Sequence, residues 1–307
     1  AFGSTYGRAF EDGRRILFSL PMYHVYGYVE GLLAALFVGG AVIPQLKFDA
    51  ADTLRAIAAH HASDVLLIPT MTLALLDALK KPDARHDLSS LRAVISSGGR
   101  APAYIWQDIF DHLQPAELTT GYGMTEVTAS STVTRPGDPI ERLLHSNGCL
   151  RDVGPAGDPA NGGLLGVYRV VDPDTGTALA SGEVGELQAR GIGVTRGYYN
   201  KPDATAAAFT PDGWLHTGDL GSVDADGYLY LAGRLKESYR CGGEQVLPTE
   251  AEDLLVTHPA VLQAHVVPVP DLRMGEVGVA FVVLREQLTA TPDELIAFCA
   301  GRLARFK

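Results

Sequence analysis

The sequence has 307 residues, 46% hydrophobic and 20% charged, which excludes an intrinsically disordered chain and suits one large domain, alone or with a small one. The formal net charge of −11 argues against a nucleic-acid partner, although a local cleft could still bind a nucleotide. Cys149, Cys241 and Cys299 are odd in number and lack metal-ligand spacing, so we expect a reducing, cytoplasmic environment. The longest uncharged stretch, residues 31–46, is short for a membrane span and contains Pro44.

The first 120 residues alternate short apolar runs with helical segments. Such alternation predicts a parallel sheet with helices on both faces. Ligands of such sheets bind at the carboxyl ends of the strands, where residues 96–100 and 120–126 fall. Asp49 or Asp52 is expected to cap the second helix. We predict strands at residues 15–19, 41–43, 64–68, 91–95 and 117–119, and helices at 27–38, 52–60, 70–79 and 102–113.

The composition and the expected secondary structure change twice in the second part of the chain. Residues 127–165 are rich in Pro, Gly and Asp, and we interpret them as loop. A smaller β unit follows, with strands at 167–171, 185–191, 214–220 and 228–232 and a helix at 202–209. Beyond Lys236 we predict an α+β module with helices at 248–256 and 292–304 and strands at 261–269 and 277–284. The expected domains are therefore residues 1–235 and a small, mobile and incomplete domain of residues 236–307.

One loop, residues 120–126, combines several groups that suit a nucleotide. Gly121 and Gly123 free the backbone on either side of Tyr122, whose ring can stack on a base. Thr125 offers a hydroxyl for a phosphate oxygen, and Glu126 a carboxylate for Mg²⁺. The alternative interpretation is a glycine-rich turn with an ordinary surface Thr and Glu.

Four further positions are candidates, each with a plainer alternative. The Asp219 carboxylate can accept both ribose hydroxyls of a nucleotide, or it caps a turn. Arg234 suits a phosphate or ribose oxygen, or forms a weak surface ion pair. Gly242 and Gly243 could let a thiol substrate approach the backbone, or form a simple turn. His24 follows the first strand among aromatic residues, where a packed, satisfied histidine is the alternative.

Together these stretches resemble the adenylate-forming superfamily, which includes acyl-CoA synthetases, firefly luciferase and the adenylation domains of peptide synthetases. Each motif is only moderately specific, but six occur in the family's order. The resemblance implies a layered parallel-sheet large domain with a smaller β unit, followed by a small α+β domain. The matching stretches are residues 21–27, 96–99, 121–126, 185–191, 214–219 and 233–252.

The resemblance also implies roles for individual residues. Tyr122 would stack on adenine, Thr125 would bind the α-phosphate and Glu126 would hold Mg²⁺. Asp219 would bind the ribose hydroxyls with Arg234 beside it. The other implied roles are an adenine pocket lined by Gly98 and Gly99, a gate to the acyl pocket at His24, a domain hinge at Lys236, and a pantetheine tunnel lined by Gly242 and Gly243.

The implied reaction has two halves. A carboxylate attacks the α-phosphorus of ATP and expels pyrophosphate, and the thiol of coenzyme A then attacks the acyl-adenylate and expels AMP. We therefore expect an acyl-CoA synthetase whose partners are a small carboxylic acid, ATP, Mg²⁺ and coenzyme A, with a homodimer left open. The alternatives are an adenylation domain that loads a carrier protein and an inactive nucleotide-binding homologue. Residues 21–27 contain no acidic side chain to pair with an amino acid's ammonium, which favours a simple carboxylic acid. The small and apolar residues expected around this pocket favour an aromatic or medium-length aliphatic acid.

The sequence also departs from the family pattern. The phosphate-binding loop is expected before Ala1 and the carboxylate-binding lysine after Lys307, so we expect this stretch alone not to complete the first half-reaction at a normal rate. Arg100 follows the glycine pair where a small residue is usual, so its guanidinium is expected to contact the nucleotide or the acyl group. His216 replaces the usual Arg or Lys before Thr217.

Overall fold

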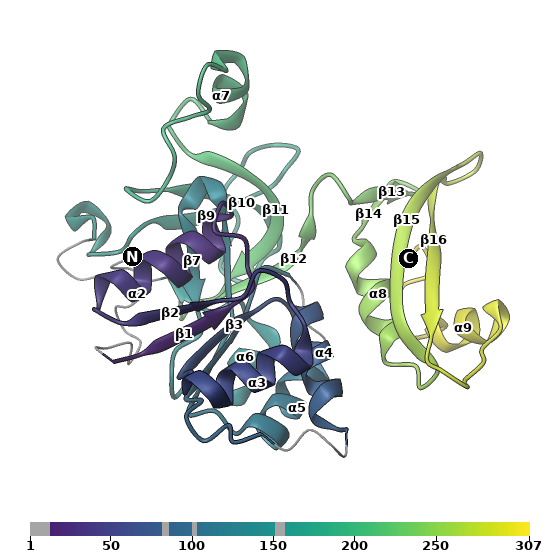
Figure 1. Cartoon of the computed structure of the whole chain (residues 1–307). Helices are drawn as coiled ribbons and strands as arrows, with labels where there is room; N and C mark the ends of the chain where they lie inside the picture. Colours follow the sequence, from purple (N-terminus) through teal and green to yellow (C-terminus); the bar gives the residue numbers. More distant parts are fainter. Residues whose placement is uncertain (1–12, 82–85, 100–102, 151–156) are drawn as a thin grey trace.

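The computed structural model describes residues 13–81, 86–99, 103–150 and 157–307. Figure 1 shows a large lobe and a small lobe, which the C-terminal segment forms. Within the described residues, no helix is long and apolar enough to cross a membrane.

The large lobe is centred on a five-stranded parallel sheet of order β2-β1-β3-β4-β5. Four of these strands are short and mainly apolar, whereas β5 has the sequence Glu-Leu-Thr. A helical segment separates consecutive strands (Figure 1). The strands are β1 (Arg15–Phe18), β2 (Ala41–Pro44), β3 (Asp64–Leu67), β4 (Ala93–Ser96) and β5 (Glu117–Thr119). The helices are η1 (Tyr26–Leu33, a π-helix), α2 (Ala34–Phe37), α3 (Ala50–His60), α4 (Pro69–Leu79) and α5 (Ala103–Leu113).

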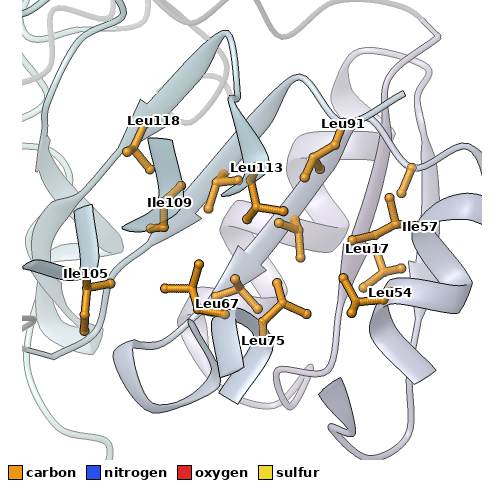
Figure 2. Packing of buried hydrophobic residues seen from close by; sticks show 14 of the residues in the cluster. Leu17, Leu54, Ile57, Leu67, Leu75, Leu91, Ile105, Ile109, Leu113 and Leu118 are labelled. Carbon is orange, nitrogen blue, oxygen red and sulfur yellow. The ribbon is translucent and has the colours of Figure 1, made fainter. Parts of the chain in front are cut away.

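Both faces of this sheet are buried, which confirms the predicted layering. Because side chains alternate along a strand, Leu17 and Leu67 join one core, and Phe18 and Leu66 join the other. The first core packs against α3, α4 and α5, as Figure 2 shows. The second core lies against η1 and α2. Asp49 caps α3 by accepting a hydrogen bond from the Asp52 amide, one of the two caps expected from the sequence.

The interpretation of residues 127–165 as loop is wrong in part. They contain β7 (Ala129–Val133), β8 (Cys149–Leu150) and α6 (Ile140–His145), and β7 pairs with β6 (Gly121–Met124) in a three-stranded antiparallel sheet. These elements escaped prediction because the strands are short and rich in Ser and Thr, without an apolar alternation. The turn before β7 places Thr128 and Ala129 in the left-handed region, with φ of 62° and 70°.

A second antiparallel sheet of order β12-β11-β10-β9 forms the predicted smaller β unit. Its strands are β9 (Val167–Val171), β10 (Gly185–Arg190), β11 (Leu215–Val223) and β12 (Leu229–Arg234), with α7 (Pro202–Ala208) between β10 and β11. The register places Asp219 of β11 opposite Arg234 of β12. The short helical turns η2 (Thr125–Val127) and η4 (Pro159–Asn161) complete this part of the lobe.

The small lobe is a four-stranded sheet of order β14-β13-β16-β15 packed against two helices. Gly242 and Gly243 form the turn of the β13–β14 hairpin with φ of 61° and 91°; the sequence had suggested the turn but not its strands. The last helix ends at Cys299, short of the predicted residue 304, because Ala300 is extended. The elements are β13 (Tyr239–Cys241), β14 (Glu244–Val246), α8 (Pro248–Val256), β15 (Val261–Asp271), β16 (Gly275–Leu284) and α9 (Pro292–Cys299).

Candidate functional site

A cavity of about 410 Å³ opens at the carboxyl ends of β4 and β5. The segments after these strands form one wall, and residues of β11 and β12 form another. The sequence singled out seven of the lining residues: Gly98, Gly99, Gly121, Tyr122, Gly123, Asp219 and Arg234.

The Tyr122 hydroxyl joins two walls of this cavity. It donates a hydrogen bond of 2.6 Å to Oδ2 of Asp219, 97 residues later in the chain. Only 6% of Tyr122 is exposed, and its ring packs in an apolar cluster with Leu187 and Leu229. Burial raises the pKa of Tyr122, so the hydroxyl remains a donor at neutral pH. Because the ring is largely enclosed by protein, its stacking on a base stays a prediction.

Asp219 is a buried acidic residue that lines the cavity. The residue is 3% exposed, and its Oδ1 lies 3.3 Å from Nε of Arg234. Burial raises the pKa of Asp219, while the Tyr122 hydrogen bond and the Arg234 charge act in the opposite direction. The carboxylate is therefore fixed in orientation and lines a space where it can accept further hydrogen bonds.

The glycines of the 120–126 loop have a structural reason beside the predicted functional one. A Cβ on Gly121 would collide with the carbonyl oxygen of Thr132, and a Cβ on Gly123 with that of Ala129. β7 therefore requires both glycines for close pairing with β6. Gly98 has φ of 82°, which only glycine adopts without strain at this turn.

Thr125 and Glu126 lie outside the main cavity, on the exposed turn that follows β6. Thr125 instead lines a second cavity of about 410 Å³ together with His24, Tyr23 and Tyr28. The structure thus brings His24 and Thr125 together, although the sequence places them 101 residues apart. Glu126 accepts a hydrogen bond of 2.8 Å from the Tyr198 hydroxyl.

Lys236, Gly242 and Gly243 line neither of these two cavities. Lys236 is an exposed residue of the connection between the lobes, and the Gly242–Gly243 turn lies in the small lobe. Arg100 lies outside the described residues. The prediction for Arg100 thus gains no structural test, and the roles of the other three stay predictions.

The donor set at Glu126 fits a cation that is shared with a ligand. The described residues hold no group of three or more His, Cys, Asp or Glu side chains that could bind a metal ion by themselves. Mg²⁺ is commonly held by one or two carboxylates together with substrate phosphates and water, so a single Glu126 is compatible with such a site.

Sequence reasoning missed one wall of the main cavity, which α6 and the following residues form. Asn147 fixes this wall, because its Oδ1 accepts a 2.9 Å hydrogen bond from the Leu231 amide and its carbonyl accepts one of 2.7 Å from the Thr132 hydroxyl. No periodic pattern marks these positions, so only the tertiary fold reveals them. The unpredicted lining residues include Trp106, His145, Asn147, Glu237 and Thr249.

Comparison with known families gives a consistent result for two parts of the chain. Residues 2–199 match the family model described as AMP-binding enzyme. Residues 250–307 match the model described as AMP-binding enzyme C-terminal domain.

Two curated relatives illustrate the similarity in sequence. The chain is 36% identical over 294 residues to 4-coumarate–CoA ligase 5 of Oryza sativa subsp. japonica, which covers 95% of this chain and 52% of that protein. It is 34% identical over 307 residues to the mitochondrial medium-chain acyl-CoA ligase ACSF2 of Danio rerio, covering 99% and 48%. The chain thus spans about half the length of the curated relatives it matches.

Solved structures are similar over the same extent. ATP-bound MatB of Rhodopseudomonas palustris superposes with a TM-score of 0.85 at 28% identity, covering 97% of this chain and 55% of that one. The o-succinylbenzoate CoA synthetase MenE of Bacillus subtilis, in complex with an acyl-adenylate, gives a TM-score of 0.82 at 28% identity, covering 99% and 57%.

Proposed function

Because this chain belongs to the AMP-binding enzyme family of the adenylate-forming superfamily, we propose that the protein joins a carboxylic acid to coenzyme A in two ATP-dependent steps. The acid attacks the α-phosphorus of ATP and releases pyrophosphate, and the coenzyme A thiol then attacks the acyl-adenylate and releases AMP. The observation that carries the proposal is the cavity at the ends of β4 and β5, where Tyr122 holds the buried Asp219 carboxylate in place.

The nucleoside part of ATP is proposed to occupy this cavity. Gly98 and Gly99 give the base a wall without side chains, and Tyr122 flanks it. Asp219 accepts hydrogen bonds from the ribose hydroxyls, with Arg234 beside it. Because Tyr122 and the β11–β12 pairing fix the carboxylate before the ligand arrives, binding loses little free energy to ordering this acceptor.

The triphosphate is proposed to extend toward the turn of Thr125 and Glu126, which directly follows β6. The Thr125 hydroxyl donates to an α-phosphate oxygen, and Glu126 is the protein ligand of Mg²⁺. When bound, Mg²⁺ would neutralise phosphate charge during attack by the carboxylate. The chain contributes mainly position and charge, as is general for phosphoryl transfer.

The acid is proposed to bind at the second cavity, where His24 meets Thr125. Its lining includes Met22, Tyr23 and Tyr28, which suit an aromatic or medium-length aliphatic acid. The relatives named as a 4-coumarate ligase and a medium-chain acyl ligase support the same two classes. His24 would act as the gate of this pocket when the thiol arrives.

The second step is proposed to use a different orientation of the small lobe. Residues 1–235 and 236–307 form the two domains, and Lys236 is the hinge. Rotation about it would bring the Gly242–Gly243 turn to the pantetheine arm, where the absence of side chains leaves room for a thiol.

ATP–pyrophosphate exchange in the full-length protein tests this proposal. A panel of aliphatic, aromatic and amino acids is supplied with Mg²⁺, and exchange is expected with one class of simple acid. Addition of coenzyme A should then release AMP and give the thioester. Absence of exchange with every acid, despite bound ATP, would contradict the proposal and favour an inactive nucleotide-binding protein.

The acceptor requires a separate arm of the experiment, because one similar structure is that of the amide bond synthetase McbA of Marinactinospora thermotolerans. The preformed acyl-adenylate is offered coenzyme A, a carrier protein bearing a pantetheine thiol, or a simple amine. Only the coenzyme A reaction agrees with the proposed acceptor.

A further inference from the structure

Tyr198 contacts the turn of Thr125 and Glu126, called the catalytic turn below, and the sequence did not predict this contact. Its hydroxyl donates a hydrogen bond of 2.8 Å to Oε1 of Glu126, 72 residues earlier in the chain. A tyrosine hydroxyl is protonated at neutral pH, so it can donate to the carboxylate.

The backbone around Tyr198 is attached to the same turn. The Thr195 amide donates a 2.7 Å hydrogen bond to the Glu126 carbonyl, and the Thr128 hydroxyl donates one of 2.7 Å to the Gly193 carbonyl. Residues 193–198 therefore lie along the 125–128 turn. The tyrosine ring reaches Glu126 from a segment that is fixed to it by main-chain contacts.

A second anchor holds Tyr198 from the other side. The Tyr198 amide donates a 2.9 Å hydrogen bond to the Thr205 hydroxyl, which itself donates one of 2.9 Å to the Lys201 carbonyl. Thr205 belongs to α7, so this helix fixes the position of Tyr198 relative to the catalytic turn. The flanking Tyr199 is 92% exposed, which makes it a natural control.

The Glu126 side chain needs such support. Its turn ends in two consecutive residues with left-handed backbone, Thr128 and Ala129, and Glu126 itself is half-exposed. A half-exposed glutamate otherwise samples several rotamers, and ordering it for a ligand costs free energy. The Tyr198 hydrogen bond occupies one carboxylate oxygen and leaves Oε2 for another partner.

We propose that Tyr198 is a positioning residue that orients the Glu126 carboxylate toward the Mg²⁺ of the bound nucleotide. This inference rests on the proposed function, in which Glu126 is the metal ligand. Groups that hydrogen-bond a metal ligand commonly change metal affinity by 10–100-fold when removed. Here phosphate oxygens share the cation, so we expect about tenfold, the lower end of that range.

The test compares Tyr198→Phe with Tyr199→Phe in the full-length protein. Binding of Mn²⁺ to the protein–ATP complex is followed by electron paramagnetic resonance, and ATP binding in excess chelator is measured in parallel. Tyr198→Phe should weaken Mn²⁺ binding about tenfold and leave metal-free ATP binding unchanged. Tyr199→Phe should match the wild type in both measurements. An unchanged Mn²⁺ affinity in Tyr198→Phe overturns the inference, as does an equal loss of metal-free ATP binding.

A double-mutant cycle separates positioning from general damage to the fold. In a Glu126→Gln background, Tyr198→Phe should cause no further loss of Mn²⁺ affinity, because both changes act on one interaction. Additive losses overturn the inference. These binding measurements need no turnover. If the wild type binds Mn²⁺ and ATP but fails to exchange pyrophosphate with any acid, the proposed function fails while the test of Tyr198 still stands.

Discussion

Asp219 is a carboxylate whose position suits binding more than stability. Burial raises its pKa above the ordinary value near 3.8, so the folded protein holds a proton more tightly than the unfolded chain. As the pH rises from 3.8 through the raised pKa, the contribution of Asp219 to the free energy of unfolding falls, and it remains low at neutral pH. The sign is opposite to that of Asp212, whose pKa is lowered to about 2, mainly by its hydrogen bond with Arg169.

Asp219→Asn should therefore separate stability from nucleotide binding. Without ligand at pH 7, removal of the buried charge should leave the Tm unchanged or raise it, and a gain of about 1 kcal/mol would correspond to roughly 2–4 °C. The gain should shrink as pH falls through the raised pKa and disappear below 3.8, where Asp219 becomes protonated in both states. ATP affinity should fall at least about tenfold, because the amide lacks the charge that strengthens hydrogen bonds to the ribose.

Calorimetric Tm values across pH and titration with ATP check this prediction. Asp212→Asn is the control, because that carboxylate is exposed and lies outside the main cavity. Asp212→Asn should lower the Tm slightly at pH 7 and leave the ATP affinity unchanged. The ionised Asp212, whose pKa is lowered, stabilises the fold above pH 3.8, and this stabilisation is lost as the pH falls toward 2. A large drop in the Tm of Asp219→Asn at pH 7 would contradict the interpretation of Asp219 as a destabilising buried charge.

At the scale of elements, the large sheet is tied together at the end opposite the cavity. Arg14 directly precedes β1, and its guanidinium donates hydrogen bonds of 2.8 Å to both oxygens of Asp64, the first residue of β3. It also lies 3.3 Å from Glu117, the first residue of β5. All three side chains are buried, so each charge is stabilised by its oppositely charged neighbours in place of water.

Asp64→Asn should destabilise the protein by about 3–5 kcal/mol, because a buried guanidinium loses its bidentate partner. Urea denaturation measures this change. Asp52→Asn removes the acidic partner of Arg55 in an exposed pair on α3 and should cost less than about 1 kcal/mol. Because the network lies at the amino ends of the strands, the folded fraction of Asp64→Asn should keep its ATP affinity. A comparable loss in both variants would refute the dependence on burial.

The strands and helices of the large sheet could be predicted from the sequence, whereas the β6–β8 sheet and the long-range side-chain contacts could not. Most strands of the large sheet are short apolar runs, and their helices begin next to residues such as Asp49 and Pro69, so the local pattern predicts them. The β6–β8 sheet is polar and has no such pattern. The pairings of Arg14 with Asp64 and of Tyr198 with Glu126 join residues 50 and 72 positions apart, and only the packed fold brings them together.

The candidate site divides in the same way. A family-like order of motifs indicated Tyr122, Asp219 and Arg234, and the fold places all three on one cavity. The order of motifs could not show that the Tyr122 hydroxyl would donate a hydrogen bond to Asp219, nor that Asn147 would fix a third wall of the cavity. Motifs specify residue types along the chain, whereas hydrogen-bond partners depend on register and bulges, such as the irregularity between Leu220 and Gly221 beside Asp219.

At the scale of the whole molecule, few polar contacts between the described residues link the two lobes beyond the connecting segment. The Thr249 hydroxyl donates a 2.5 Å hydrogen bond to the Ala232 carbonyl, and Arg240 lies 2.6 Å from Asp174. The latter pair is exposed and contributes little free energy in water. Rotation of the small lobe about the connection would therefore break few favourable interactions, as the proposed second orientation requires.

Lys236→Pro tests this rotation. The neighbouring Leu235, Glu237 and Ser238 amides donate to main-chain carbonyls, whereas the exposed Lys236 is not a donor in these turn contacts, so proline removes none of them. Proline fixes φ at its own position and restricts Leu235. One half-reaction should therefore slow at least about tenfold, equivalent to 1.4 kcal/mol in the barrier, while the other stays close to the wild-type rate.

The two rates are measured separately, by ATP–pyrophosphate exchange and by reaction of the preformed acyl-adenylate with coenzyme A. Lys236→Gln removes the charge but keeps a flexible backbone, so both rates should remain near those of the wild type. If Lys236→Pro lowers both rates equally, or if Lys236→Gln reproduces its effect, the connection is not a hinge between catalytic orientations. A selective loss in Lys236→Pro alone would mean that the two chemical steps require different placements of the small lobe.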